Sequence, residues 1–165
     1  MAGSPPAAVL TWEQLTQITS RLAHAAHADT APATVVGVLR GGMIPAVHIA
    51  HLLGVRDVRA LDVTHTLGEG INAAKAPSPV LRNAVSVGDL TRCDVLLVDD
   101  IAGSGETLAA SHRLLQAAGA ARIRTAACAV NEINWRRASD RDPGGAITYV
   151  GASYQGWVVF PWETR

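Results

Sequence analysis

The residues best suited to chemistry lie together in one segment, residues 95–108. Four apolar residues, 95–98, are followed by Asp99 and Asp100, by the turn Gly103-Ser104-Gly105 and by Thr107. The turn exposes backbone N–H groups, and a helix that begins at Thr107 carries partial positive charge at its N-terminus. Backbone amides and two hydroxyls then make an anion site suited to a phosphate monoester. Two carboxylates beside such a site suit a ribose diol or a magnesium ion.

Three other glycine motifs do not fit this segment. A Walker A loop needs a lysine before its hydroxyl residue, and the segment contains no lysine. A dinucleotide fingerprint needs a third glycine where Leu108 stands, and a nucleophile elbow needs spacers that Gly103-Ser104-Gly105 lacks. The structural alternative is a tight strand-to-helix turn with solvated acids. The complete order of strand, acids, glycines and hydroxyls favours a binding site over that alternative.

The surrounding elements are predicted to alternate between strands and helices, which favours βαβ units and a mostly parallel sheet with ligands at the carboxyl ends of its strands. Thr11 and Gln14 form the signature of a capping box at the start of the first helix. Residues 131–146 are a polar connection. The expected helices are 12–27, Met43–Leu53 and 107–118, and the expected strands are Thr34–Leu39, 55–64, 94–98, 122–130, 147–150 and 157–160.

The length of 165 residues fits one domain. We expect residues 1–10 to be a disordered tail and residues 11–165 to form the domain. Residues 65–92 contain several glycines and prolines without sustained periodicity, which is typical of a functional lid or a disordered loop.

Composition excludes several classes of protein. Lys plus Arg and Asp plus Glu both number 14, so no basic field for nucleic acid is expected. Cys93 and Cys128 form neither a disulfide framework nor a zinc pattern. No secretory signal or membrane span is recognised, so we expect a cytoplasmic protein without a membrane partner. Lys75 is the sole lysine.

Segment 95–108 closely resembles the phosphoribosyl pyrophosphate signature of type I phosphoribosyltransferases, in which an apolar strand and two acids precede Thr/Ser-Gly-x-Thr. Residues 37–46, Gly-Val-Leu-Arg-Gly-Gly-Met-Ile-Pro-Ala, resemble the pyrophosphate loop of the xanthine–guanine branch. The C-terminal Trp157-Val-Val-Phe-Pro-Trp-Glu163 resembles the end of the same enzymes. The resemblance implies the type I phosphoribosyltransferase fold, an α/β fold whose mostly parallel central sheet is flanked by helices, with a mobile lid and a small C-terminal hood.

The resemblance also implies roles for individual residues. Asn131, Trp157 and Val158 would bind the base, and Asp100 and Glu163 would hold Mg²⁺ as the cofactor. The peptide bond between Leu39 and Arg40 is a candidate for the cis form. The phosphoribosyl pyrophosphate site would comprise Arg40, Gly41, Asp99, Asp100, Ala102, Gly103, Ser104, Gly105, Glu106 and Thr107, with Arg40, Asp99 and Asp100 as the catalytic residues.

The implied activity is Mg²⁺-dependent transfer of a 5-phosphoribosyl group to a nitrogen of a nucleobase or base-like acceptor, with release of pyrophosphate. Two departures concern the acceptor. Gly103 stands where 6-oxopurine enzymes carry an aspartate, and no lysine lies near Asn131. An atypical acceptor is therefore expected, although a purine remains possible, and Glu106 or His65 are conceivable proton partners. Family habit favours a homodimer or homotetramer.

Two alternatives remain open. The first is a regulator on the same fold that senses phosphoribosyl pyrophosphate or a nucleotide without catalysis, since the departures affect only the acceptor side. The second is an α/β domain with an incidental phosphate loop.

Overall fold

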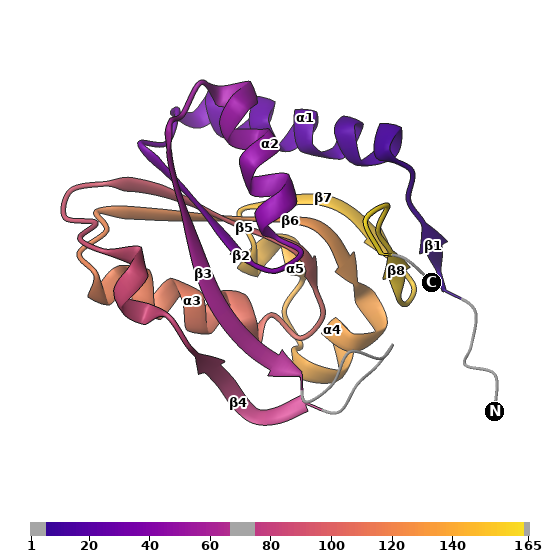
Figure 1. Cartoon of the computed structure of the whole chain (residues 1–165). Helices are drawn as coiled ribbons and strands as arrows, with labels where there is room; N and C mark the ends of the chain where they lie inside the picture. Colours follow the sequence, from indigo (N-terminus) through magenta and orange to yellow (C-terminus); the bar gives the residue numbers. More distant parts are fainter. Residues whose placement is uncertain (1–5, 67–74, 164–165) are drawn as a thin grey trace.

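The central sheet has six strands, and the structure, a computed structural model, describes residues 6–66 and 75–163 (Figure 1). The strands are β2 (Thr34–Leu39), β3 (Asp57–Thr66), β4 (Lys75–Leu81), β5 (Asp94–Ala102), β6 (Arg122–Asn131) and β7 (Tyr149–Tyr154). Their order across the sheet is β4-β3-β2-β5-β6-β7. Neighbouring strands are parallel except β3 and β4, which are antiparallel. The predicted α/β fold with a mostly parallel sheet is confirmed.

Helices cover both faces of this sheet. Figure 1 shows α1 (Trp12–Asp29) and α2 (Met43–Leu53) together on one side and α3 (Glu106–Ala117) on the other. Successive residues of β5 serve the two faces in turn. Leu96 and Val98 pack in the core beneath α1 and α2, whereas Val95 and Leu97 pack in the core that contains α3. All four are fully buried, and each contributes roughly 2 kcal/mol by leaving water.

The helix signals in the sequence act as expected. The Thr11 hydroxyl accepts a hydrogen bond from the Gln14 amide (3.2 Å), and the Gln14 side chain accepts one from the Thr11 amide (2.8 Å). Helix α2 begins and ends at the predicted residues and stops at Gly54, whose φ of 68° lies in the left-handed region. No helix in the described part of the chain is long and apolar enough to cross a membrane.

Two connections contain more regular structure than expected. Within the expected loop 65–92, the chain forms β4 and a 3₁₀ turn, η1 (Ala84–Val87). Sequence patterning missed β4 because Pro77 and Pro79 argue against a strand, but β4 lies at the sheet edge, where a missing N–H is tolerated. The polar connection 131–146 contains two short helices, α4 (Glu132–Ala138) and α5 (Pro143–Ala146).

The expectation of a tail over residues 1–10 is wrong for its described end. Strand β1 (Ala8–Val9) pairs in parallel with β8 (Val158–Val159) in a separate two-stranded sheet. The Ala7 amide donates to the Trp157 carbonyl (2.7 Å), and Leu10 is buried. A two-residue strand is too short to show periodicity, so the sequence offered no signal for it. Residues 1–5 lie outside the described part of the chain.

A charged network joins the end of α1 to the amino ends of β5, β6 and β7. Arg124 is only 2% exposed, and its guanidinium donates to Asp94 (2.8 Å). Asp29 accepts from Arg122 (2.6 Å) and from the Tyr149 hydroxyl (3.0 Å). The hydrogen bond from Tyr149 is the largest effect and lowers the pKa of Asp29. Desolvation opposes it, and the charges of Arg122 and Arg124 lower the pKa further.

Asp29→Asn is expected to lower the melting temperature at pH 7 by a few degrees. The pKa of Asp29 in the folded protein lies below its value in the unfolded chain, about 3.9. Its carboxylate therefore stabilises the fold above that value, and this contribution is lost as the pH falls through the folded pKa. Thermal unfolding from pH 7 to pH 3 should show the melting temperatures of variant and wild type converging in acid.

The control is Asp140→Asn, which removes an exposed carboxylate and should leave the melting temperature unchanged across this range. A difference between Asp29→Asn and wild type that persists undiminished at pH 3 would contradict the assignment.

Candidate functional site

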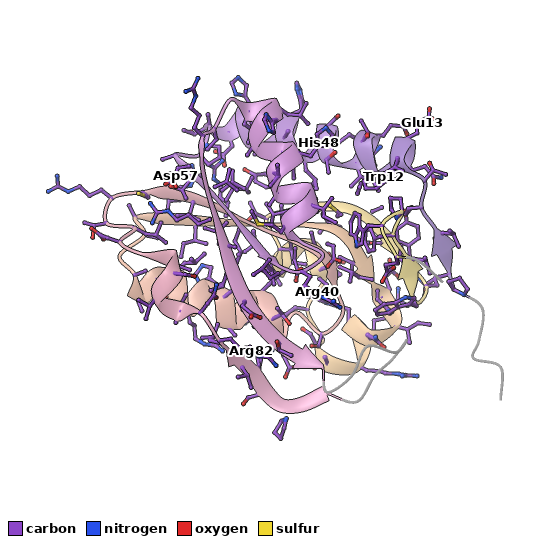
Figure 2. All side chains as sticks on the ribbon, in the orientation of Figure 1. Trp12, Glu13, Arg40, His48, Asp57 and Arg82 are labelled. Carbon is purple, nitrogen blue, oxygen red and sulfur yellow. The ribbon has the colours of Figure 1, made fainter. Side chains whose placement is uncertain are left out.

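The site lies where β2 and β5, neighbours in the sheet, reach their carboxyl ends. Strand β2 runs into Arg40, Gly41 and Gly42, the arginine loop, which leads directly into α2. Strand β5 ends with Asp99 and Asp100, the acid pair, which lie within its last four residues rather than just after it. Figure 2 shows Arg40 near the middle of the molecule, at the carboxyl end of the sheet.

The arginine loop fits against the acid pair only because it contains glycine. A methyl group on Gly41 would lie 1.7 Å from Oδ2 of Asp100, and one on Gly42 would lie 2.8 Å from Cα of Asp99. The peptide bond between Leu39 and Arg40 is cis, as the resemblance suggested. The arginine loop and the acid pair are therefore in direct contact, with Arg40 directly before the glycines that touch the two aspartates.

The acid pair consists of one buried carboxyl group, that of Asp99, and one partly buried carboxyl group, that of Asp100. Asp99 is 6% exposed, its Oδ1 accepts from the Asp100 amide (3.0 Å), and Oδ1 of Asp100 accepts from the Ile101 amide (2.8 Å). Burial raises the pKa of both carboxyls, and the charge of Asp100 raises that of Asp99 further. Such a pair favours a cation or hydroxyl donors from a ligand.

The phosphate loop, residues 102–107, joins the acid pair to α3. Gly105 precedes the helix with a φ of 79°, a left-handed conformation that glycine adopts readily. No side chain caps the first turn of α3. The first N–H groups of a helix lack partners within the helix and favour an anion. The Ser104 hydroxyl donates to Glu106 (2.9 Å), so both polar side chains lie at this end.

The C-terminal segment brings Glu163 to the acid pair. Strand β8 is buried and paired with β1, which fixes the chain that follows it. Oε2 of Glu163 accepts from the Phe160 amide (2.7 Å), and the charge of Glu163 raises the pKa of Asp100. Glu163 and the acid pair thus come from distant parts of the sequence, and the charge of Glu163 acts on Asp100.

The predicted base-binding residues, Asn131, Trp157 and Val158, differ in burial and in the hydrogen bonds that they already make. Trp157 is half-buried directly before β8, and Val158 is fully buried within it. Asn131 is buried, and its Oδ1 accepts from the Asn134 amide (3.2 Å), which makes it the N-cap of α4. Its oxygen is therefore already used within the fold. The side chain of His65, a conceivable proton partner, lies outside the described residues.

Sequence reasoning missed Trp135. This residue of α4 is 3% exposed, and its ring contacts Gly105 of the phosphate loop. The available signal was Asn131 followed by Glu132, an N-cap and an acidic first turn, which predicts a helix start. The contact itself depends on tertiary packing and leaves no trace in local sequence.

A family model described as "Phosphoribosyl transferase domain" matches residues 7–165. This chain belongs to the phosphoribosyl transferase domain family. The predicted family, fold and enzyme class, a phosphoribosyltransferase, are confirmed.

Known relatives agree with this assignment. A xanthine-guanine phosphoribosyltransferase of Gluconobacter oxydans is 29% identical over 158 residues, covering 95% of this chain and 84% of the relative. One from Ruegeria sp. is 30% identical over 133 residues, covering 78% of this chain and 67% of the relative. The crystal structure of a purine phosphoribosyltransferase from Pyrococcus horikoshii superimposes with a TM-score of 0.74 at 29% identity, covering 96% of this chain and 94% of that one.

Gly41→Ala is expected to reduce kcat/KM for phosphoribosyl transfer by about 100-fold. The added methyl would overlap Asp100, so the arginine loop and the acid pair would have to separate, and displacement of reacting groups by 1 Å costs about that factor. Steady-state assays would measure the loss. The matched control is Gly145→Ala, because a methyl at Gly145 meets no atom within 4 Å. Wild-type activity in Gly41→Ala would show that this contact does not hold the site together.

Proposed function

We propose that this protein transfers the 5-phosphoribosyl group of phosphoribosyl pyrophosphate to a ring nitrogen of a purine or purine-like base and releases pyrophosphate. The observation that carries the proposal is the acid pair, held between the arginine loop and the uncapped N-terminus of α3. Two anion-binding elements thus flank a pair of carboxylates, which matches a donor with phosphates on both sides of a ribose. The names of the relatives from Gluconobacter and Ruegeria support the same reaction.

The donor would be held by three groups. The amides and hydroxyls of residues 103–107 would bind the 5′-phosphate at the positive end of α3. Arg40, with its planar fork of donors, and Gly41 would take the pyrophosphate. The acid pair would hold the ribose hydroxyls, which can donate hydrogen bonds to carboxylates.

Magnesium fits the donor set. Carboxylate oxygens of Asp100 and Glu163 are the hard ligands that Mg²⁺ prefers, and the charge of Glu163 already raises the pKa of Asp100, so a cation between them would relieve this repulsion. No cluster of three possible protein ligands occurs in residues 6–66 and 75–163. The protein would thus share the ion with substrate oxygens, as magnesium sites commonly do. When bound, Mg²⁺ supplies neutralisation of the leaving pyrophosphate.

The chain contributes mainly positioning and electrostatics. As the bond from the anomeric carbon to pyrophosphate breaks and the bond to the acceptor nitrogen forms, charge develops on the ribose and on the leaving oxygens. Arg40 would stabilise the negative charge on the leaving oxygens, the α3 amides would keep the 5′-phosphate in place, and the acid pair would face the positive ribose.

The acceptor side supports an atypical base. Gly103 offers no side chain, and the oxygen of Asn131 is used to cap α4. Trp157 would stack on the acceptor, and the backbone of Val158 would read its edge. The carboxylate of Glu106, bonded to Ser104, would take the proton of the acceptor. We further propose that the protein acts in the cytoplasm as a homodimer or homotetramer.

A regulator that binds phosphoribosyl pyrophosphate or a nucleotide without turnover is the second candidate. Gly103 is the observation that favours it, because a protein that no longer transfers to a base needs no proton partner there.

Pyrophosphate release decides between the candidates. We expect wild-type protein with phosphoribosyl pyrophosphate and Mg²⁺ to release pyrophosphate with at least one base from a panel of xanthine, guanine, hypoxanthine, adenine and non-purine rings. Asp100→Asn should lower kcat/KM by about 100-fold, because it removes charge that faces the reacting ribose. Asp140→Asn should retain wild-type rates.

Calorimetric titration with phosphoribosyl pyrophosphate completes the test. Tight binding without turnover on any base would contradict the enzyme and support the regulator. Equal donor affinity in wild type and Asp100→Asn would indicate an incidental phosphate loop.

A further inference from the structure

A tryptophan from another element closes on the phosphate loop. A methyl group built on Gly105 would lie 2.8 Å from Cζ3 and 3.0 Å from Cη2 of Trp135. The edge of the indole therefore lies directly against the backbone of the loop. Gly105 is required here twice, by its positive φ of 79° and by the absence of space for a side chain.

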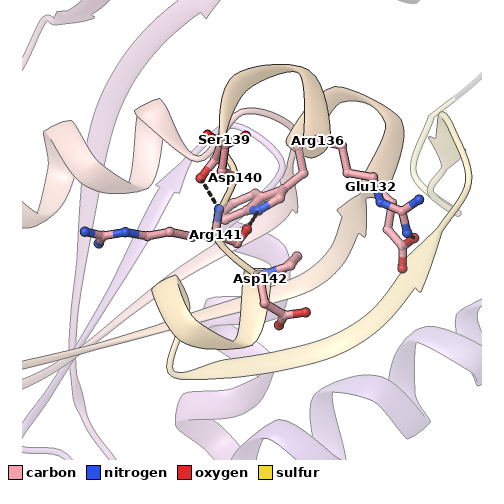
Figure 3. A pocket seen from close by; sticks show the side chains of 8 residues that line it. Glu132, Arg136, Ser139, Asp140, Arg141 and Asp142 are labelled. Carbon is pink, nitrogen blue, oxygen red and sulfur yellow. Dashed lines mark hydrogen bonds and ion pairs between the residues drawn. The ribbon is translucent and has the colours of Figure 1, made fainter.

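The indole is itself held in place from two sides. Asn131 caps α4 and fixes the start of the helix that carries Trp135. Nε1 of Trp135 donates to the Arg141 carbonyl (2.7 Å), one of the hydrogen bonds drawn as dashed lines in Figure 3. Trp135 also lines a cavity of about 380 Å³ between α4 and the segment that follows it. The ring thus has a fixed position while its surroundings on the cavity side remain open. The other lining residues are Glu132, Arg136, Ser139, Asp140, Arg141, Asp142 and Pro143.

We propose that Trp135 is a positioning residue for the 5′-phosphate of the donor. The inference rests on the proposed function, because it assumes that the phosphate loop binds this phosphate. Gly103 and Gly105 leave the loop many conformations, and ordering it on binding would cost affinity. The fixed indole edge limits those conformations before the donor arrives. The amides of the loop are then already directed at the phosphate, which is where preorganised donors are most effective.

The expected effect of a change at Trp135 is confined to recognition of one end of the donor, the 5′-phosphate. The close contacts of Gly41 and Gly42 are with the acid pair and with the backbone carbonyls of Val38 and Val98, and α4 contributes none of them. A change at Trp135 therefore weakens recognition of the 5′-phosphate and leaves recognition of pyrophosphate intact. This asymmetry separates positioning of the loop from a general loss of stability.

Two probes that each carry half of the donor test the proposal. Ribose 5-phosphate and inorganic pyrophosphate are measured as competitive inhibitors against phosphoribosyl pyrophosphate, in wild type, Trp135→Leu and Trp135→Phe. In Trp135→Leu we expect the inhibition constant of ribose 5-phosphate and the KM of the donor to rise about tenfold. The inhibition constant of pyrophosphate and the KM of the base should stay within twofold. Trp135→Phe, with a shorter ring and no Nε1 donor, should give a smaller rise of the same pattern and serves if the leucine variant does not fold.

Introducing Gly105→Ala both into the wild type and into Trp135→Leu isolates the contact between residue 105 and the indole. Gly105→Ala carries backbone strain in any background, but its methyl meets the indole only when Trp135 is present. Gly105→Ala should therefore weaken ribose 5-phosphate binding more in wild type than in Trp135→Leu. Equal losses in both backgrounds would overturn the proposal.

The control is Leu22→Ala on α1, which removes a buried side chain from the other core. It should lower the melting temperature and leave both inhibition constants unchanged. If Trp135→Leu shifts both constants equally, or neither, Trp135 has no positioning role. Wild-type protein with no affinity for ribose 5-phosphate or for the donor would instead overturn the proposed function.

Discussion

Two parallel strands, β2 and β5, lie side by side, so their carboxyl ends are at the same edge of the sheet. Adjacent strands are about 4.8 Å apart, so the segments that leave them must share very little space. Here one segment supplies carboxylates and the other supplies glycine backbone, so that Gly41 lies where any side chain would overlap Asp100. The rest of the site is arranged around this contact. Arg40 leaves on one side of the acid pair, α3 begins on the other, and Glu163 approaches with the C-terminal segment.

Local electrostatics would allow a chain of zero net charge to bind the highly charged donor of the proposed reaction. Arg40 and the first backbone amides of α3 provide positive potential beside the carboxylates of the acid pair. Burial raises the pKa of Cys128, and the charges of Asp100 and Asp99 raise it further, which keeps this thiol protonated and inert inside the sheet. Global charge and composition are therefore poor guides to ligand charge when a site is built from backbone and metal.

Most of the scaffold could be predicted because its signals are local. Strand β2 and helix α2 have the predicted bounds, since β2 is a short β-branched run that ends at Arg40 and α2 is an apolar run with glycine at both ends. The acid pair and the phosphate loop were also recognisable, because their order along the chain reflects their order in space. Strands β1 and β4 could not be found in this way, because pairing with distant segments or packing at an edge overrides weak local preference. Asn131 was expected to bind the base, but its side-chain oxygen caps α4, and only the folded chain shows this partner.

The parallel pairing of β1 with β8 has a consequence for how the protein is assembled. The two strands are separated by nearly the whole central sheet in sequence, so their contact closes a very long loop. On the ribosome, β1 must wait until the sheet between them has been synthesised before it finds its partner. The segment that carries Trp157 and Glu163 is fastened by this pairing and by the amide of Ala7. Docking of this C-terminal segment is thus a late step of folding, and it can follow the formation of the central sheet.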